Sequence, residues 1–166
     1  CKNSMSANGP VRDGVFICKP ATEVIAAGEQ RHIPYLIGMT SQDIMPPILY
    51  KMAGDWCRTQ AAQNGPASYE WFFDRQLPGD ACGAWHSSDC WRPFTAQDKV
   101  LSAQMVSYLT NFAKHGDPNG TDVPVWLPID AAQHKVLRLG EQPARMGSAS
   151  MPKLVWTMLT NKAVGE

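Results

Sequence analysis

Three residues with reactive side chains recur every four positions in CGAWHSSDCW, residues 82–91: Cys82, His86 and Cys90. On a helix this spacing aligns side chains on one face, and thiolates and imidazoles are the ligands that zinc prefers. A proline and two glycines in and just before the stretch oppose a helix, however, and no fourth ligand is obvious. We therefore treat a zinc site as the weaker interpretation and expect no metal.

The same histidine could instead act as a general base. A neutral imidazole accepts a proton near pH 7, and it does so best when a carboxylate holds its other ring nitrogen. Asp43 is the candidate carboxylate. A cysteine nucleophile, Cys82 or Cys90 with His86, is a third possibility, but neither thiol lies beside Lys or Arg or at an obvious helix start. The structural alternatives are a loop histidine bonded to backbone and, for Asp43, a helix N-cap.

The elements around these residues predict how they are positioned. Apolar runs predict strands at 32–38, 69–74 and 134–141. The first strand leads into a loop that contains Asp43, and the second leads into a long loop, 75–89, that contains His86. Helical spacing predicts helices at 19–30, 47–62, from Thr95 to Gly116, and from Ser150 onward. This order predicts an α/β fold with a few-stranded, mostly parallel sheet and flanking helices.

Three of the helices have a predicted inner face. For 47–62 it comprises Ile48, Leu49, Met52 and Trp56. The helix after Thr95, with Asp98 three residues on as a capping box, has an inner face of Leu101, Met105, Tyr108, Leu109 and Phe112. The last helix has an inner face of Leu154, Val155, Met158 and Leu159.

Parallel strands place their carboxyl ends at one edge of a sheet, so Asp43 and His86 are expected to meet there although they are 43 residues apart. In α/β-hydrolases the order along the chain is Ser, then Asp or Glu, then His. The sequence has no G-x-S-x-G and no run of three glycines for an oxyanion hole. The nearest approach, MGSAS at 146–150, lacks the second glycine and is not expected between a strand and a helix.

Composition limits the class of protein. The chain has 166 residues, 15 Lys+Arg and 15 Asp+Glu, which predicts one domain over 1–166 and gives no electrostatic reason to expect nucleic acid or a membrane as partner. Five cysteines without C-x-x-C spacing suggest reduced thiols and a cytoplasmic location. Asn119-Gly120-Thr121 matches a glycosylation triplet, which is common by chance. His32, His115 and His134 are expected to be solvated.

Several motifs together resemble the C-terminal part of the type B carboxylesterases, the α/β-hydrolase family that includes cholinesterases and para-nitrobenzyl esterases. The resemblance runs through nearly the whole chain. It rests on GPVRDGVF (9–16), IPYLIGMTSQD (33–43), GAWHSSD (83–89), WRPFTAQDKVLSAQMVSYLTNFAKHGDPNG (91–120) and VPVWLP (123–128). The stretches at 44–68 and 89–91 are shorter than the family's usual pattern.

The resemblance implies a C-terminal part of an α/β-hydrolase fold and a carboxylic-ester hydrolase. Asp43 falls on the catalytic acid, usually glutamate in the family, and His86 on the catalytic histidine, with Trp85 and Asp89 supporting the histidine loop. The serine would come from an absent N-terminal part, so we expect these 166 residues alone to be inactive. The implied substrate is a small-molecule ester, and no cofactor is needed. An exposed sheet edge is expected to pair with the missing part or a second copy. The alternative is a non-catalytic binding or adhesion module, as some relatives are.

Overall fold

The computed structural model describes residues 10–76, 79, 82–90 and 95–160. Cys1, parts of the predicted 75–89 loop and the start of the 91–120 motif lie outside the described residues. The chain divides into two compact units, 1–32 and 33–166, and the single domain expected over 1–166 stays a prediction. The first unit contains helix α1 (Ala21–Ala26), which begins after Pro20 and ends before Gly28, whose φ is +67°.

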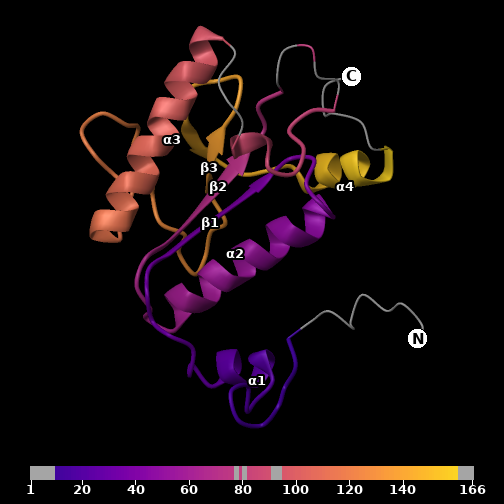
Figure 1. The fold of residues 1–166 in the computed structure, drawn as a ribbon, viewed down its shortest axis with the longest axis vertical. Helices are drawn as coiled ribbons and strands as arrows, with labels where there is room; N and C mark the ends of the chain where they lie inside the picture. Colours follow the sequence, from indigo (N-terminus) through magenta and orange to yellow (C-terminus); the bar gives the residue numbers. More distant parts are fainter. Residues whose placement is uncertain (1–9, 77–78, 80–81, 91–94, 161–166) are drawn as a thin grey trace. The chain divides into compact units, whose positions relative to one another are not determined.

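The second unit is built on a four-stranded sheet, and the predicted α/β fold is confirmed. The strands are β1 (Tyr35–Thr40), β2 (Ser68–Phe73), β3 (Val136–Leu139) and β4 (Arg145–Gly147), in the spatial order β1-β2-β3-β4 (Figure 1). β1, β2 and β3 run parallel, and β4 pairs antiparallel with β3. The three parallel strands correspond to the three predicted from the sequence, whereas β4 was not predicted.

Side chains that alternate along the strands of the sheet belong to two separate hydrophobic clusters. Tyr69 and Phe73 of β2 belong to a cluster with Trp126 and the buried side of α3 (Ala96–His115). Phe72, with the opposite parity, belongs to a cluster with buried residues of α2 (Pro46–Ala62) and α4 (Met151–Thr160). Because successive strand residues point to opposite faces, α3 covers one face of the sheet, and α2 and α4 cover the other.

Helix α3 begins and ends as its sequence predicts. The Thr95 hydroxyl accepts a hydrogen bond from the backbone N–H of Asp98, and the Asp98 carboxylate accepts one from the backbone N–H of Thr95. This reciprocal pair is the predicted capping box. The helix stops at Gly116, whose φ of +70° suits a residue without a side chain.

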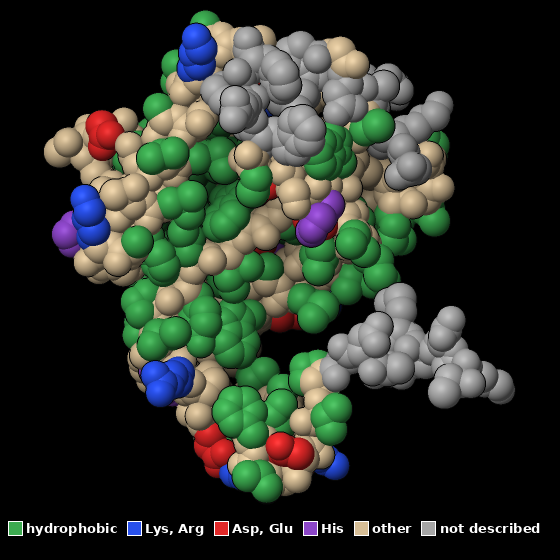
Figure 2. Space-filling model, viewed as in Figure 1, with side chains coloured by type: hydrophobic (Ala, Val, Ile, Leu, Met, Phe, Trp, Pro, Cys, Tyr) green, Lys and Arg blue, Asp and Glu red, His purple; other side chains and the backbone are tan. Residues whose placement is uncertain are grey.

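The predicted inner faces of the helices are only partly correct. Ile48 and Met52 of α2 are exposed, as are Leu109 of α3 and Val155, Met158 and Leu159 of α4. In α2 the buried face is instead made by Tyr50, Gly54, Cys57 and Gln60, and in α4 by Leu154 and Thr157. Both helices carry apolar residues on several sides, so spacing alone does not identify the packed side, and hydrophobic side chains remain visible over the surface in Figure 2. Within the described part of the chain, none of the helices combines the length and apolar character needed to cross a membrane.

Candidate active site

Asp43 and His86 meet at the carboxyl end of the parallel sheet. Asp43 lies three residues beyond β1, and His86 lies on the loop that follows β2. The His86 Nδ1 is 2.7 Å from the Asp43 Oδ1, a hydrogen-bonding distance. The Asp43 side chain is 10% exposed and the His86 side chain 65%. The predicted proximity of Asp43 and His86 is therefore observed. The second ring nitrogen, Nε2, belongs to a side chain that is largely exposed to solvent.

The Asp43 carboxylate is held by its own loop. Its Oδ1 accepts a hydrogen bond of 2.7 Å from the Ile44 N–H, and its Oδ2 accepts a longer one of 3.4 Å from the Thr40 N–H. The N-cap position of α2 is Met45, which makes no side-chain capping bond. The alternative role of Asp43 as a helix N-cap is therefore wrong, and the carboxylate faces the imidazole instead.

The two loops are joined through Gln42, which the sequence analysis did not single out. Gln42 and Trp85 form an isolated parallel β-bridge. The Gln42 backbone N–H donates to the Ala84 carbonyl at 2.9 Å, and the Gln42 Oε1 accepts from the Ala84 N–H at 2.5 Å. Trp85 thus takes part in the loop pairing through its backbone, and its supporting role beside His86 stays a prediction. Glutamine beside a candidate acid carries no chemical signal of its own, which is why residue type did not reveal it.

Asp89, the second supporting candidate, lies close to the thiol of Cys90. The Cys90 Sγ and Asp89 Oδ1 are 3.7 Å apart, whereas the hydrogen bond of the His86 ring goes to Asp43. The charge of Asp89, together with burial, raises the pKa of the Cys90 thiol. A catalytic thiol needs the opposite shift, so this environment disfavours Cys90 as a nucleophile.

The zinc interpretation gains no support from the geometry. Among residues 10–76, 79, 82–90 and 95–160, no three His, Cys, Asp or Glu side chains gather closely enough to hold a metal ion. The segment that carries Cys82, His86 and Cys90 contains only a short 3₁₀ turn, Ser88–Cys90, rather than a helix that would align the three. The expectation that no metal or cofactor is needed stays a prediction.

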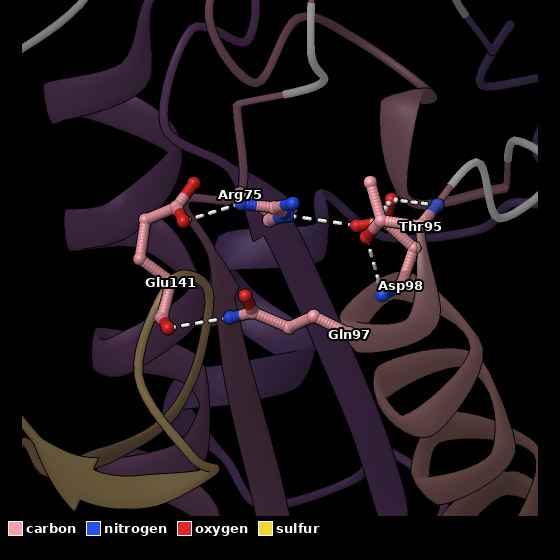
Figure 3. A network of polar contacts seen from close by, with 5 residues as sticks. All are labelled: Arg75, Thr95, Gln97, Asp98 and Glu141. Carbon is pink, nitrogen blue, oxygen red and sulfur yellow. Dashed lines mark hydrogen bonds and ion pairs between the residues drawn. The ribbon is translucent and has the colours of Figure 1, made fainter.

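One ion-pair network connects the two ends of the loop that carries His86 (Figure 3). Arg75, two residues beyond β2, donates from Nε to the Asp98 Oδ1 at 2.8 Å and from Nη1 to the Glu141 carboxylate. Asp98 in turn bonds Thr95, where the loop ends and α3 begins. The network therefore ties the start of the loop to its end and to the segment after β3.

The two central charges of this network are buried, since the side chains of Arg75 and Asp98 are 8% and 6% exposed. Burial acts to raise the pKa of Asp98, but the hydrogen bonds from Arg75 and Thr95 outweigh it and lower the pKa to about 2. Glu141 is half-exposed and completes the network at its solvent side. Asp98 therefore stays ionised at any physiological pH.

A second histidine–carboxylate pair corrects the expectation that His134 is solvated. The His134 Nε2 is 2.6 Å from the Glu70 Oε2, the His134 ring stacks on Tyr50 with ring centroids 4.2 Å apart, and Glu70 is fully buried. Burial raises the pKa of Glu70, and the hydrogen bond with His134 opposes that rise. Gly54 of α2 lies against the imidazole, where a Cβ would overlap it. This pair is packed between the sheet and α2.

Two further expectations concern residues near the chain's C-terminal part. MGSAS at 146–150 does lie between a strand, β4, and a helix, α4, contrary to expectation, because the three-residue β4 was not predicted. Ser148 and Ser150 line a cavity of about 320 Å³ that also reaches Gln42.

The side-chain amide of Asn119, in the glycosylation triplet, bonds the Asp117 carboxylate and the Trp126 backbone. These bonds make Asn119 a structural residue of its turn.

The backbone next to each candidate residue is strained. Ser87, directly after His86, has a φ of +70°, and Met45, two residues after Asp43, has a φ of +54°. Residues other than glycine adopt this left-handed region at a cost of about 1–2 kcal/mol. Such strain clusters at functional loops, which agrees with the placing of both residues beside the Asp43–His86 pair.

Replacing Ser87 with glycine is expected to raise the free energy of unfolding by about 0.5–1 kcal/mol, because glycine adopts a positive φ without steric cost. The matched control is Ser102→Gly inside α3, which should lower stability by about 0.5–1 kcal/mol because glycine disfavours a helix interior. Urea denaturation of the two variants measures both effects. Equal destabilisation by both would contradict the assigned strain at Ser87.

Comparison with known proteins supplies the family context. The model of the family described as "Carboxylesterase family" matches residues 82–155. An acylcarnitine hydrolase of Rattus norvegicus is 43% identical over 51 residues, which is 31% of this chain and 9% of that protein. The cocaine esterase of Homo sapiens is 41% identical over 51 residues, with the same shares of 31% and 9%.

The match therefore spans less than a tenth of the length of these curated relatives. A solved structure titled as an esterase from Clostridium hathewayi that can hydrolyse aliphatic aromatic polyesters aligns with a TM-score of 0.48 and 20% identity. The alignment covers 66% of this chain and 24% of that one.

Proposed function

Because residues 82–155 match the model of the carboxylesterase family, we propose that the chain supplies the acid and the histidine of a serine hydrolase that cleaves carboxylic esters. The observation that carries the proposal is the 2.7 Å hydrogen bond between His86 Nδ1 and Asp43 Oδ1. It joins an imidazole and a carboxylate on the loops that follow two adjacent parallel strands, in the chain order that such hydrolases use. The substrate is a small-molecule ester.

In the proposed mechanism the nucleophile is a serine from polypeptide outside these 166 residues, since the sequence contains no G-x-S-x-G. His86 Nε2 removes the serine proton as the hydroxyl oxygen bonds to the ester carbonyl carbon. The same proton then passes to the leaving alcohol as the ester bond breaks. In the second half, His86 deprotonates water, which releases the acid and restores the serine. Asp43 keeps Nδ1 protonated and stabilises the imidazolium throughout.

The testing experiment measures hydrolysis of p-nitrophenyl acetate by a complete protein that contains this chain. We expect His86→Ala to remove at least about 1,000-fold of the activity, because the base is lost at both halves of the reaction. His32→Ala is the matched control, since His32 is an exposed histidine that bonds only the Gly28 carbonyl among the described contacts. An active His86→Ala variant would refute the proposal.

The 166-residue chain tested alone gives the complementary result. We expect no p-nitrophenyl acetate turnover above a buffer blank, because the proposed nucleophile lies elsewhere. Turnover that disappears on His86→Ala would show instead that this chain carries its own nucleophile.

We also propose that β1 pairs with a further strand. β1 is at the edge of the four-stranded sheet, since among the described strands it pairs with β2 on one side. An open parallel edge favours strand addition, by another part of the same protein or by a second copy. Size-exclusion chromatography with light scattering that finds a stable monomer of the isolated chain would count against this pairing.

We propose a reducing, cytoplasmic location for the same protein. Two observations support it: Cys18, Cys57 and Cys90 form no disulfide with one another within the described part of the chain, and the Asn119 amide is occupied by internal hydrogen bonds. Fractionation of cells that express the complete protein tests this location. Recovery of the protein from the medium would contradict it.

A further inference from the structure

We propose that Gln42 is a positioning residue that fixes the distance between Asp43 and His86, an inference that rests on the proposed function of the pair. Gln42 makes two hydrogen bonds to one residue of the opposite loop. Its backbone N–H donates to the Ala84 carbonyl at 2.9 Å, and its side-chain Oε1 accepts from the Ala84 N–H at 2.5 Å. Both backbone polar groups of Ala84 are therefore held by a single residue next to the candidate acid.

The side-chain contact depends on an oxygen acceptor at the length of a glutamine. Besides the Ala84 N–H, the Oε1 accepts a hydrogen bond of 2.6 Å from the Ser41 hydroxyl. Two donors converge on this one atom, which assigns it as the amide oxygen rather than the nitrogen. A methionine would keep the length and lose the acceptor, and an asparagine would keep the amide and lose one methylene.

The opposite loop is shaped to receive this side chain. Gly83 has a φ of +67°, and a Cβ at this position would lie 2.6 Å from the Gln42 Cδ. Ala84 next to it is 1% exposed. The absence of a side chain at Gly83 therefore lets the two loops approach closely enough for the amide to reach the backbone.

The Gln42–Ala84 contact can fix the positions of Asp43 and His86 because both residues lie close to it along the chain. Asp43 directly follows the Gln42 anchor in the chain, and only Trp85 lies between the Ala84 anchor and His86. His86 is 65% exposed, so packing around the ring constrains it little and its place depends largely on the backbone. A displacement of about 1 Å in a catalytic group can cost about 100-fold in rate. Gln42 is thus placed to affect the chemical step without touching the substrate.

The test compares Gln42→Met with Gln42→Glu in the complete protein. We expect Gln42→Met to lower kcat by about 10- to 100-fold with KM changed less than about 2-fold, because the pair is displaced while ester binding is untouched. Gln42→Glu retains an oxygen acceptor and should recover kcat to within about 5-fold of the wild type. A Gln42→Met variant with wild-type kcat, or a Gln42→Glu variant as impaired as Gln42→Met, would overturn the proposal.

A second readout separates this inference from the proposed function. Long-range ¹H–¹⁵N correlation spectra of the 166-residue chain report which nitrogen of His86 carries the proton at a pH where the ring is neutral. We expect the Nδ1-protonated form to dominate in the wild type and to lose its dominance in Gln42→Met. If esters are not hydrolysed but this change occurs, the function fails and the positioning role of Gln42 stands.

An unchanged tautomer ratio in a folded Gln42→Met variant would overturn the positioning role. Should Gln42→Met fail to fold, Gln42→Asn takes its place with the same two readouts, since it retains the amide but falls one methylene short of Ala84. Wild-type kcat and an unchanged tautomer ratio in Gln42→Asn would likewise overturn the inference.

Discussion

Replacing Asp43 with asparagine is expected to lower kcat for ester hydrolysis by about 10,000-fold while the protein stays folded. Asparagine has nearly the same shape, but its amide nitrogen can donate to Nδ1, which stabilises the tautomer with the proton on Nε2. In that form His86 cannot remove the serine proton. Steady-state kinetics with p-nitrophenyl acetate measure the loss, and far-UV circular dichroism checks the fold.

The matched control for this prediction is Asp89→Asn. The Asp89 carboxylate lies beside the Cys90 thiol, and the imidazole bonds Asp43, so this variant should keep kcat within about 3-fold of the wild type. Full activity in Asp43→Asn combined with an inactive Asp89→Asn would transfer the role of the acid to Asp89.

The sequence identified this pair because its geometry follows from topology. Two apolar runs predict parallel strands, and parallel strands end at one edge, so the loops that follow the two runs start at the same edge of the sheet. The capping box of α3 was predictable for a similar reason, since Thr95 and Asp98 act within four residues of chain. Helix capping and sheet topology can therefore both be predicted from a single sequence.

Features that depend on packing between distant elements were not readable. Glu70 lies in a run of aromatic residues and gives no sign of a buried partner, and His134 lies 64 positions away, two residues before β3. Their pairing requires β2 and β3 to be neighbours and α2 to present Gly54 at that point. Gln42 was missed for the same reason, because its partner is a backbone group of the opposite loop rather than a residue type.

Replacing Arg75 with methionine is expected to lower the free energy of unfolding by about 3–5 kcal/mol. The change removes the cation that neutralises Asp98, whose side chain is 6% exposed, and leaves that carboxylate buried with only the hydrogen bonds from Thr95. Glu141 is half-exposed and is solvated by water in the variant. Urea denaturation of wild type and variant measures the loss, with Lys51→Met as the control. Lys51 pairs with Asp55 at the surface, and breaking that pair should cost less than about 1 kcal/mol.

The pH dependence of the free energy of unfolding tests the same ion pair independently of the total stability that Arg75→Met loses. Asp98 has an ordinary pKa of 3.8, which falls to about 2 in the folded protein. A carboxyl group with a lowered folded-state pKa stabilises the fold above its unfolded value, and the benefit is lost as pH falls through the folded value. Wild type should therefore lose about 2 kcal/mol from this group between about pH 4 and pH 2. In Arg75→Met this loss should shrink, because methionine no longer favours the charged form. An identical pH dependence of the free energy of unfolding in both proteins would show that Arg75 does not keep Asp98 ionised. The ion pair would then not be what connects the two ends of the His86 loop.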